Sequence, residues 1–198
     1  MSSTQLLITN IRQQHAIKVI KSHGPYRFFV TLTFQYFLAN DEEGIEYASL
    51  FLRRLHRNMF GRKWRSIEPI RGSVTLEHAC IKKRSHGKDR GNCHFHMLLK
   101  DHEKFSKCNW SAIRKLNSAV KAAGNALNYQ QTSKLVSKHG TKTKFVRDNG
   151  IINYITKEAR DFSWWDEDRF FLLGNYELVP AQIPRPKERD TLPLAAIA

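Results

Sequence analysis

Two short apolar runs that flank a basic loop constrain the fold of this chain most strongly. Residues 73–81 (SVTLEHACI) and 93–99 (CHFHMLL) have the composition of strands, and the segment between them, KKRSHGKDRGN, carries two glycines. This pattern predicts a β-hairpin with antiparallel strands. A hairpin at the centre of the chain favours an antiparallel sheet over a doubly wound parallel one.

The remaining segments predict both helices and strands. Residues 27–35 (RFFVTLTFQ) are rich in Phe, Val and Thr, which is typical of a strand. Residues 127–147 are ambiguous, with room for a short strand and a basic loop, and we expect 162–178 to form a final packed segment. Four segments indicate helices: 1–22, 42–60, 109–123, which we expect to end at Gly124, and 150–161. The predicted fold is α+β, a central antiparallel sheet of about five strands flanked by helices, which we expect on one face.

The charge of the chain indicates its partner. Thirty-three Lys and Arg against 18 Asp and Glu give +15 over 198 residues, and the basic clusters alternate with apolar runs. A folded domain with such a positive field most simply binds nucleic acid. We expect an N-terminal extension at 1–26, a functional domain at 27–178 and a proline-containing C-terminal tail at 179–198.

Other function classes are excluded by what the sequence lacks. No stretch approaches the roughly 18–20 apolar residues of a membrane span, and the N-terminus does not have the pattern of a secretory signal. Cys80, Cys93 and Cys108 show neither a disulfide framework nor the close spacing of a zinc site. We therefore expect an intracellular protein with no membrane partner.

The most specific local motif is His94-Phe95-His96 in a predicted strand. Residues i and i+2 of a strand share a face, so both imidazoles lie side by side while Phe95 points into the core. Neutral imidazole is a common ligand of divalent ions. Glu77, on the paired strand, completes a two-His, one-carboxylate site if it lies opposite these residues. A register shifted by one residue would present His78 instead, so both remain candidates.

A second motif lies in the predicted helix 150–161. Tyr154 and Lys157 are three residues apart and therefore neighbours on one helix face. A tyrosine can act as a covalent nucleophile, and a nearby cation stabilises developing phosphate charge. An ordinary amphipathic helix would have the same pattern, and Tyr129 is a second candidate phenol outside the motif.

Taken in order, three motifs resemble the HUH endonucleases, and among them the single-tyrosine initiators of rolling-circle replication (Rep proteins) of small viruses, phages and plasmids. The motifs are the Thr-containing apolar strand at 28–34, the His94-Phe95-His96 strand, and the helix with Tyr154 and Lys157. The resemblance covers roughly residues 27–160. It implies the same antiparallel sheet flanked by helices.

The resemblance also implies a mechanism. His94, His96 and Glu77 would hold Mg²⁺ or Mn²⁺, which polarises a phosphate of single-stranded DNA. Tyr154 would attack that phosphorus and form a 5′-phosphotyrosine link, while Lys157 would offset the developing charge. The strand at 28–34 would be a scaffold, with a DNA-facing edge at Thr31 and Thr33.

The expected substrate is single-stranded DNA or an origin hairpin in the host cytoplasm or nucleoid. Five basic residues of the hairpin loop would contact its phosphates: Lys82, Lys83, Arg84, Lys88 and Arg90. The chain has no G-x-x-x-x-G-K-[ST] loop, so we expect a separate helicase and polymerase.

Two alternatives remain beside the replication initiator. A single-strand transposase shares the late tyrosine, whereas a relaxase usually has its tyrosine before the His motif. A basic nucleic-acid-binding domain without activity would carry His94, His96 and Tyr154 as structural residues.

Overall fold

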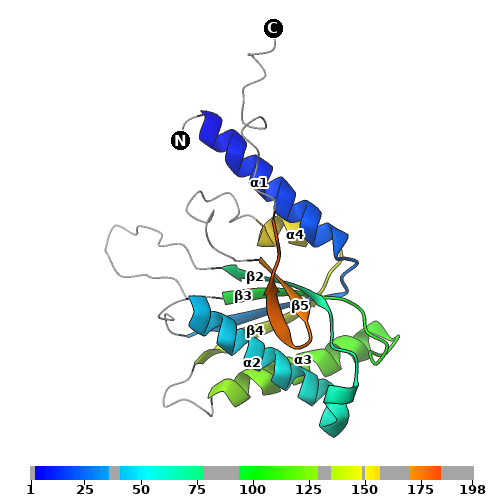
Figure 1. The fold of residues 1–198 in the computed structure, drawn as a ribbon. Coiled ribbons are helices and arrows are strands. Elements are labelled where there is room, and N and C mark those ends of the chain that lie inside the picture. The colour runs from blue at the N-terminus through cyan, green and yellow to red at the C-terminus, as the bar shows by residue number, and fades with distance from the viewer. Residues whose placement is uncertain are drawn as a thin grey trace.

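The computed structural model describes residues 3–35, 41–77, 94–128, 135–148, 150–156 and 170–183. Helices and strands are mixed along the chain (Figure 1). In order, the elements are α1 (Ser3–Ser22), β1 (Phe28–Phe34), α2 (Asp41–Phe60), the 3-10 helix η1 (Gly61–Ser66), β2 (Gly72–Glu77), β3 (His94–Leu99), α3 (Asn109–Asn128), β4 (Val136–Phe145), α4 (Gly150–Ile155), β5 (Phe170–Gly174) and β6 (Glu177–Pro180).

The strands form one six-stranded sheet in the order β4-β1-β3-β2-β5-β6, and every neighbouring pair is antiparallel. The predicted α+β class is therefore confirmed, and so is the pairing of β2 with β3. The ambiguous segment 127–147 contributes β4 at one edge of the sheet. Residues 170–180 contribute β5 and β6 at the other edge, which brings the sheet to six strands.

The larger core lies between the sheet and helices α2 and α3. Alternate residues of β1 belong to it, including Phe28, Val30 and Leu32, all fully buried. They pack with apolar residues of α2 and α3, of which Leu55 and Leu116 are also fully buried. Strand alternation thus gives the central strands of the sheet an apolar face toward these two helices.

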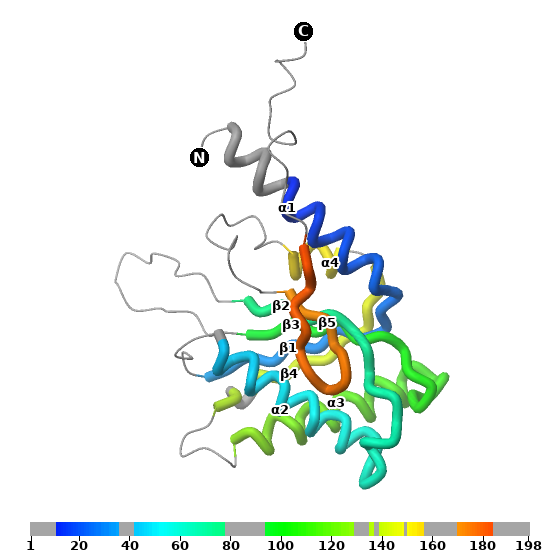
Figure 2. The backbone as a smooth tube through the Cα atoms, viewed as in Figure 1, coloured from blue at the N-terminus to red at the C-terminus, as the bar shows by residue number. Residues whose placement is uncertain are grey.

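The opposite face carries a second, smaller core. Phe29 and Leu98, from the other set of alternating positions, pack with Ile20 of α1 and with Ile152 and Ile155 of α4. Figure 2 shows α1 and α4 on one side of the sheet and α2 and α3 on the other. The expectation of helices on a single face was wrong, because apolar residues also occur at the positions that face away from the main core.

Helix α3 continues through Gly124, where we expected it to end, and reaches Asn128. A Cβ at position 124 would lie 3.0 Å from Cγ2 of Thr141 in β4. The glycine therefore permits a close approach of the helix to the edge strand and does not end the helix. None of the described helices is both long and apolar enough to cross a membrane.

Candidate functional site

The register of the central hairpin brings the predicted ligands together. Glu77 of β2 is directly paired with His94 of β3, and Thr75 with His96. Val74 and Leu76 face the main core, so the alternation places Thr75 and Glu77 on the face away from it. Because of this alternation, Glu77 is the carboxylate that shares a face with the two imidazoles. His78, the other candidate, lies outside the described residues.

Both imidazoles converge on one carboxylate oxygen. Nε2 of His94 lies 2.9 Å from Oε2 of Glu77, and Nε2 of His96 lies 2.6 Å from the same atom. One ligand atom from each residue lies within 4.8 Å of the other two. Glu77 and His96 are buried, with 5% and 3% of their surfaces exposed, while His94 is half-buried. The geometry is that of a three-ligand group that could hold a metal ion.

The electrostatics of this cluster fit a cation. A buried carboxylate needs a compensating positive charge, which either a protonated imidazole or a metal ion supplies. A nitrogen and oxygen donor set with two imidazoles and one carboxylate suits a divalent transition metal with open coordination positions. On the same face, the hydroxyl of the buried Thr75 has no hydrogen-bond partner among the described residues. An unpaired buried hydroxyl next to His96 also fits a hydrated ion there.

Thr31 of β1 contacts Nδ1 of His96, the ring nitrogen that does not face Glu77. Its Oγ1 lies 3.2 Å from Nδ1 of His96, and the two residues are paired across β1 and β3. The hydroxyl can accept from Nδ1–H, which keeps the proton on Nδ1 and frees Nε2 as a ligand. The Phe29 ring stacks on the same imidazole, with ring centroids 5.3 Å apart. His96 is therefore held in orientation from two directions.

Helix α4 brings Tyr154 to this cluster. The rings of Tyr154 and His96 are 5.3 Å apart between centroids, at 65°. Tyr154 is 45% exposed, so a ligand from solvent can reach the phenol. The sequence motifs at 77, 94–96 and 154, separated by up to 77 positions, therefore meet at one place.

Packing and hydrogen bonds fix the position of α4. Ile152 and Ile155 are buried in the smaller core, where they pack with Phe29 and Leu98 of the sheet. The fully buried Thr156 donates its hydroxyl proton to the carbonyl of Ile152, 2.8 Å away. The Gln13 amide of α1 reaches Oγ1 of Thr156 at 3.5 Å. Helix α1 thus helps to hold the element that carries the tyrosine.

Several predicted site residues lie outside the described part of the chain. Lys157 comes directly after Thr156, the last described residue of that segment, and is therefore outside the described residues. The same holds for the basic residues of the hairpin loop: Lys82, Lys83, Arg84, Lys88 and Arg90.

Sequence reasoning missed the contacts that Phe29 and Thr31 make with His96. The signal was present in the alternation of β1, since residues 29, 31 and 33 share one face, but the pairing of β1 with β3 was not known. It also missed Lys142 and Lys144 of β4, which are paired with Thr31 and Phe29 and therefore lie on the site face.

Comparison of the chain with protein-family models, with curated proteins and with solved structures finds no match in any of the three. The geometry of the cluster and the sequence motifs are therefore the observations that bear on function.

Proposed function

We propose that this chain is a metal-dependent endonuclease and strand transferase for single-stranded DNA, of the HUH type, that initiates rolling-circle replication inside its host cell. One observation carries the proposal: a His-Phe-His strand, a carboxylate and a tyrosine from a separate helix converge. A buried His-carboxylate cluster alone would fit many metalloproteins. An exposed phenol 5.3 Å from one of the imidazoles adds a nucleophile to it.

The residues divide into a metal-binding group and a nucleophile. His94, His96 and Glu77 would hold Mn²⁺ or Mg²⁺, which would polarise a phosphate oxygen and stabilise charge on the phosphorus as it reacts. Tyr154 is exposed and able to reach a phosphate bound beside His96. Lys157 belongs to the proposal from its sequence position, and its cationic side chain would stabilise the phosphate.

The proposed reaction conserves atoms and involves no oxidation. Oη of Tyr154 attacks the phosphorus and loses its proton, a new P–O bond forms, and the bond to the 3′ oxygen breaks. The 3′ oxygen takes up a proton and leaves as a hydroxyl. The products are a 5′-phosphotyrosine on the protein and a DNA end with a free 3′-OH. Attack by a 3′-OH on the phosphotyrosine reverses these steps and joins a strand.

The test is capture of the covalent intermediate. The protein is incubated with Mn²⁺ and single-stranded oligonucleotides that include origin hairpins, labelled at either end, and separated under denaturing conditions. A 3′-labelled oligonucleotide should shift with the protein, because the link is to the 5′ phosphate of that fragment. A 5′-labelled one should give a shorter free product that a polymerase extends.

Two tyrosine variants make this test specific. Tyr154→Phe should lose the covalent product, and Tyr129→Phe, the matched change at the other candidate phenol, should keep it. A product that survives Tyr154→Phe would show that another residue is the nucleophile. Absence of product from the wild-type protein on all origin hairpins, together with salt-sensitive DNA binding, would support a binding domain without activity.

A further inference from the structure

A hollow at the edge of the sheet adjoins the tyrosine. It lies across the C-terminal half of β4, which is an edge strand, and its walls come from both sides of the sheet. Trp110 and Ile113 of α3 line one side, and Phe29 of β1 and Ile151 of α4 line the other. The hollow therefore passes around the sheet edge from the face of α3 to the face of the metal-binding cluster.

Two of its lining residues connect the hollow to the site. Phe29 lines it and stacks on His96, with ring centroids 5.3 Å apart. Ile151 lines it and precedes Tyr154 by three positions, which is about one helical turn. A chain bound at Tyr154 would thus reach the hollow within a short distance.

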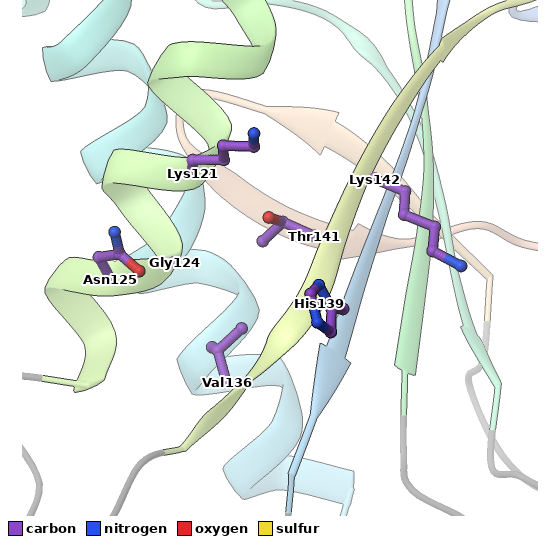
Figure 3. A pocket seen from close by; sticks show the side chains of 7 residues that line it. All are labelled: Lys121, Gly124, Asn125, Val136, His139, Thr141 and Lys142. Carbon is purple, nitrogen blue, oxygen red and sulfur yellow. The ribbon is translucent and has the colours of Figure 1, made fainter.

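The rim of the hollow is basic. Lys144 and Arg147 line it, and both are exposed. Lys142, also exposed, is paired with Thr31 and lies on the site face, and Figure 3 shows its side chain pointing away from α3 and Thr141. Asp148 is the one acidic residue among those that line the hollow, and its Oδ1 accepts a hydrogen bond from the amide of Gly150. The positive charge of this rim favours the binding of a polyanion.

Trp110 gives the hollow an aromatic platform. It is 76% exposed, more than any other large hydrophobic residue in the described part of the chain. Tyr154, at 45%, is the other exposed aromatic residue there. An indole left in water next to cationic side chains is the arrangement with which proteins stack unpaired bases and hold the adjoining phosphates.

We propose that this hollow binds the single-stranded DNA next to the reacting phosphate, with a base stacked on Trp110 and phosphates at Lys144 and Arg147. The inference rests on the proposed function, since it assigns the path of the same substrate. Duplex DNA fits less well, because its base faces are already stacked. Addition of a protein strand to β4 is opposed by the exposed lysines along it.

The test measures binding without chemistry. Fluorescence anisotropy of a labelled 15-nucleotide oligo-dT is followed with the Tyr154→Phe protein in EDTA. Trp110→Ala should weaken binding by about 5- to 150-fold, the loss of one stacked base. Trp110→Phe, which keeps a ring, should recover most of the affinity. At 76% exposure, Trp110 contributes little to the core, so thermal unfolding should be unchanged.

Charge variants test the phosphate contacts. Lys144→Ala should reduce the slope of log affinity against log salt by about 0.7, the value for one phosphate on a single strand. Lys63→Ala is the matched control, because it removes the same charge from the exposed surface of η1, beyond the far end of α2 (Figure 1). It should leave the slope unchanged. Equal effects of Lys63→Ala and Lys144→Ala would overturn the assigned contact.

The outcomes separate the two proposals. If Trp110→Ala leaves oligo-dT affinity unchanged, or weakens a duplex of the same length equally, the hollow does not stack an unpaired base and this inference fails even if Tyr154 forms the covalent product. If Trp110→Ala weakens single-strand binding but no covalent product forms with any origin hairpin, the hollow holds DNA and the proposed chemistry fails.

Discussion

Oε2 of Glu77 lies 2.6 Å from Nε2 of His96, and both side chains are buried on the same face of the sheet. Such a contact is stable only if a proton or a cation lies between the two atoms, because a carboxylate oxygen and a bare imidazole nitrogen repel each other. Nε2 of His94 lies 2.9 Å from the same oxygen. One carboxylate oxygen is thus within hydrogen-bond distance of two imidazole nitrogens, and a divalent ion would satisfy all three.

The first prediction concerns metal binding. Mn²⁺ at about 100 times its dissociation constant should stabilise the fold by about 2.7 kcal/mol, which corresponds to a rise in Tm of about 5–10 °C for a domain of this size. His96→Ala should abolish the rise, because it removes one of three ligands. Differential scanning fluorimetry with and without Mn²⁺ measures the shift for each protein against its own metal-free baseline.

His102→Gln is the control for this shift. His102 follows β3 at the end opposite His94, and its Nε2 contacts the carbonyl of Glu68. The variant should unfold earlier than the wild type but show the full rise with Mn²⁺. A rise that persists in His96→Ala, or one that disappears in His102→Gln, would mean that the ion binds elsewhere.

The sequence was sufficient for the central hairpin because its alternation is unambiguous. Val74 and Leu76 must enter the core, so Glu77 shares a face with Thr75, and Phe95 divides His94 from His96 in the same way. What the sequence did not contain is the register between strands. Apolar alternation fixes the face on which each side chain lies, but it does not fix which residue of β2 is opposite which residue of β3.

Edge elements were harder to predict, for a physical reason. Strand β4 reads VSKHGTKTKF, in which Lys142 and Lys144 lie on the site face and Thr141 and Thr143 face α3, so it lacks the apolar alternation of a strand. Its pairing with β1 is a tertiary effect. Gly124 misled the prediction of α3 because its role is a close contact with Thr141, which no local pattern contains.

The second prediction concerns pH and stability. His56 is 2% exposed, its Nδ1 lies 2.8 Å from the carbonyl of Leu52, and its Nε2 accepts from the amide of Ile70 at 2.7 Å. Burial lowers the pKa of His56 from 6.5 to about 4. The unfolded chain therefore takes up a proton below pH 6.5 that the folded protein does not bind until pH 4. Stability from this residue is present above pH 6.5 and falls by about 3 kcal/mol between pH 6.5 and 4.

His56→Gln isolates that contribution. Urea unfolding of both proteins across pH 7 to 4 should show a large difference in the free energy of unfolding at pH 7, which shrinks by about 3 kcal/mol as the pH falls. All other titrating groups are common to the two proteins and cancel in the difference. A difference that does not vary with pH would show that His56 is not held neutral in the fold.

The third prediction concerns α1. Ile20 is 1% exposed in the smaller core, where it packs with residues of the sheet and of α4. Ile20→Ala should reduce the free energy of unfolding by about 2–5 kcal/mol, because a buried side chain is replaced by a cavity. Lys18→Ala, an exposed position on the same helix, should change it by less than about 0.5 kcal/mol. Equal, small effects would mean that α1 does not contribute to the folded core.

The fourth prediction concerns Thr31, which contacts the proposed metal site through His96. Its Oγ1 lies 3.2 Å from Nδ1 of the imidazole. Thr31→Val has nearly the same shape and keeps a β-branched residue in the strand, but it removes the hydroxyl. Loss of such a supporting hydrogen bond typically weakens metal binding about 10- to 100-fold. Isothermal titration with Mn²⁺ should show this loss without a matching fall in Tm of the metal-free protein.

Thr33→Val and Thr31→Ser complete the test. Thr33 lies on the same strand and the same face, directly paired with His94, so its change to Val is matched in chemistry and position. It should leave the Mn²⁺ affinity unchanged. Thr31→Ser restores a hydroxyl and should recover most of the affinity. If Thr31→Val and Thr33→Val weaken Mn²⁺ binding equally, the effect is one of strand packing, and Thr31 does not orient His96.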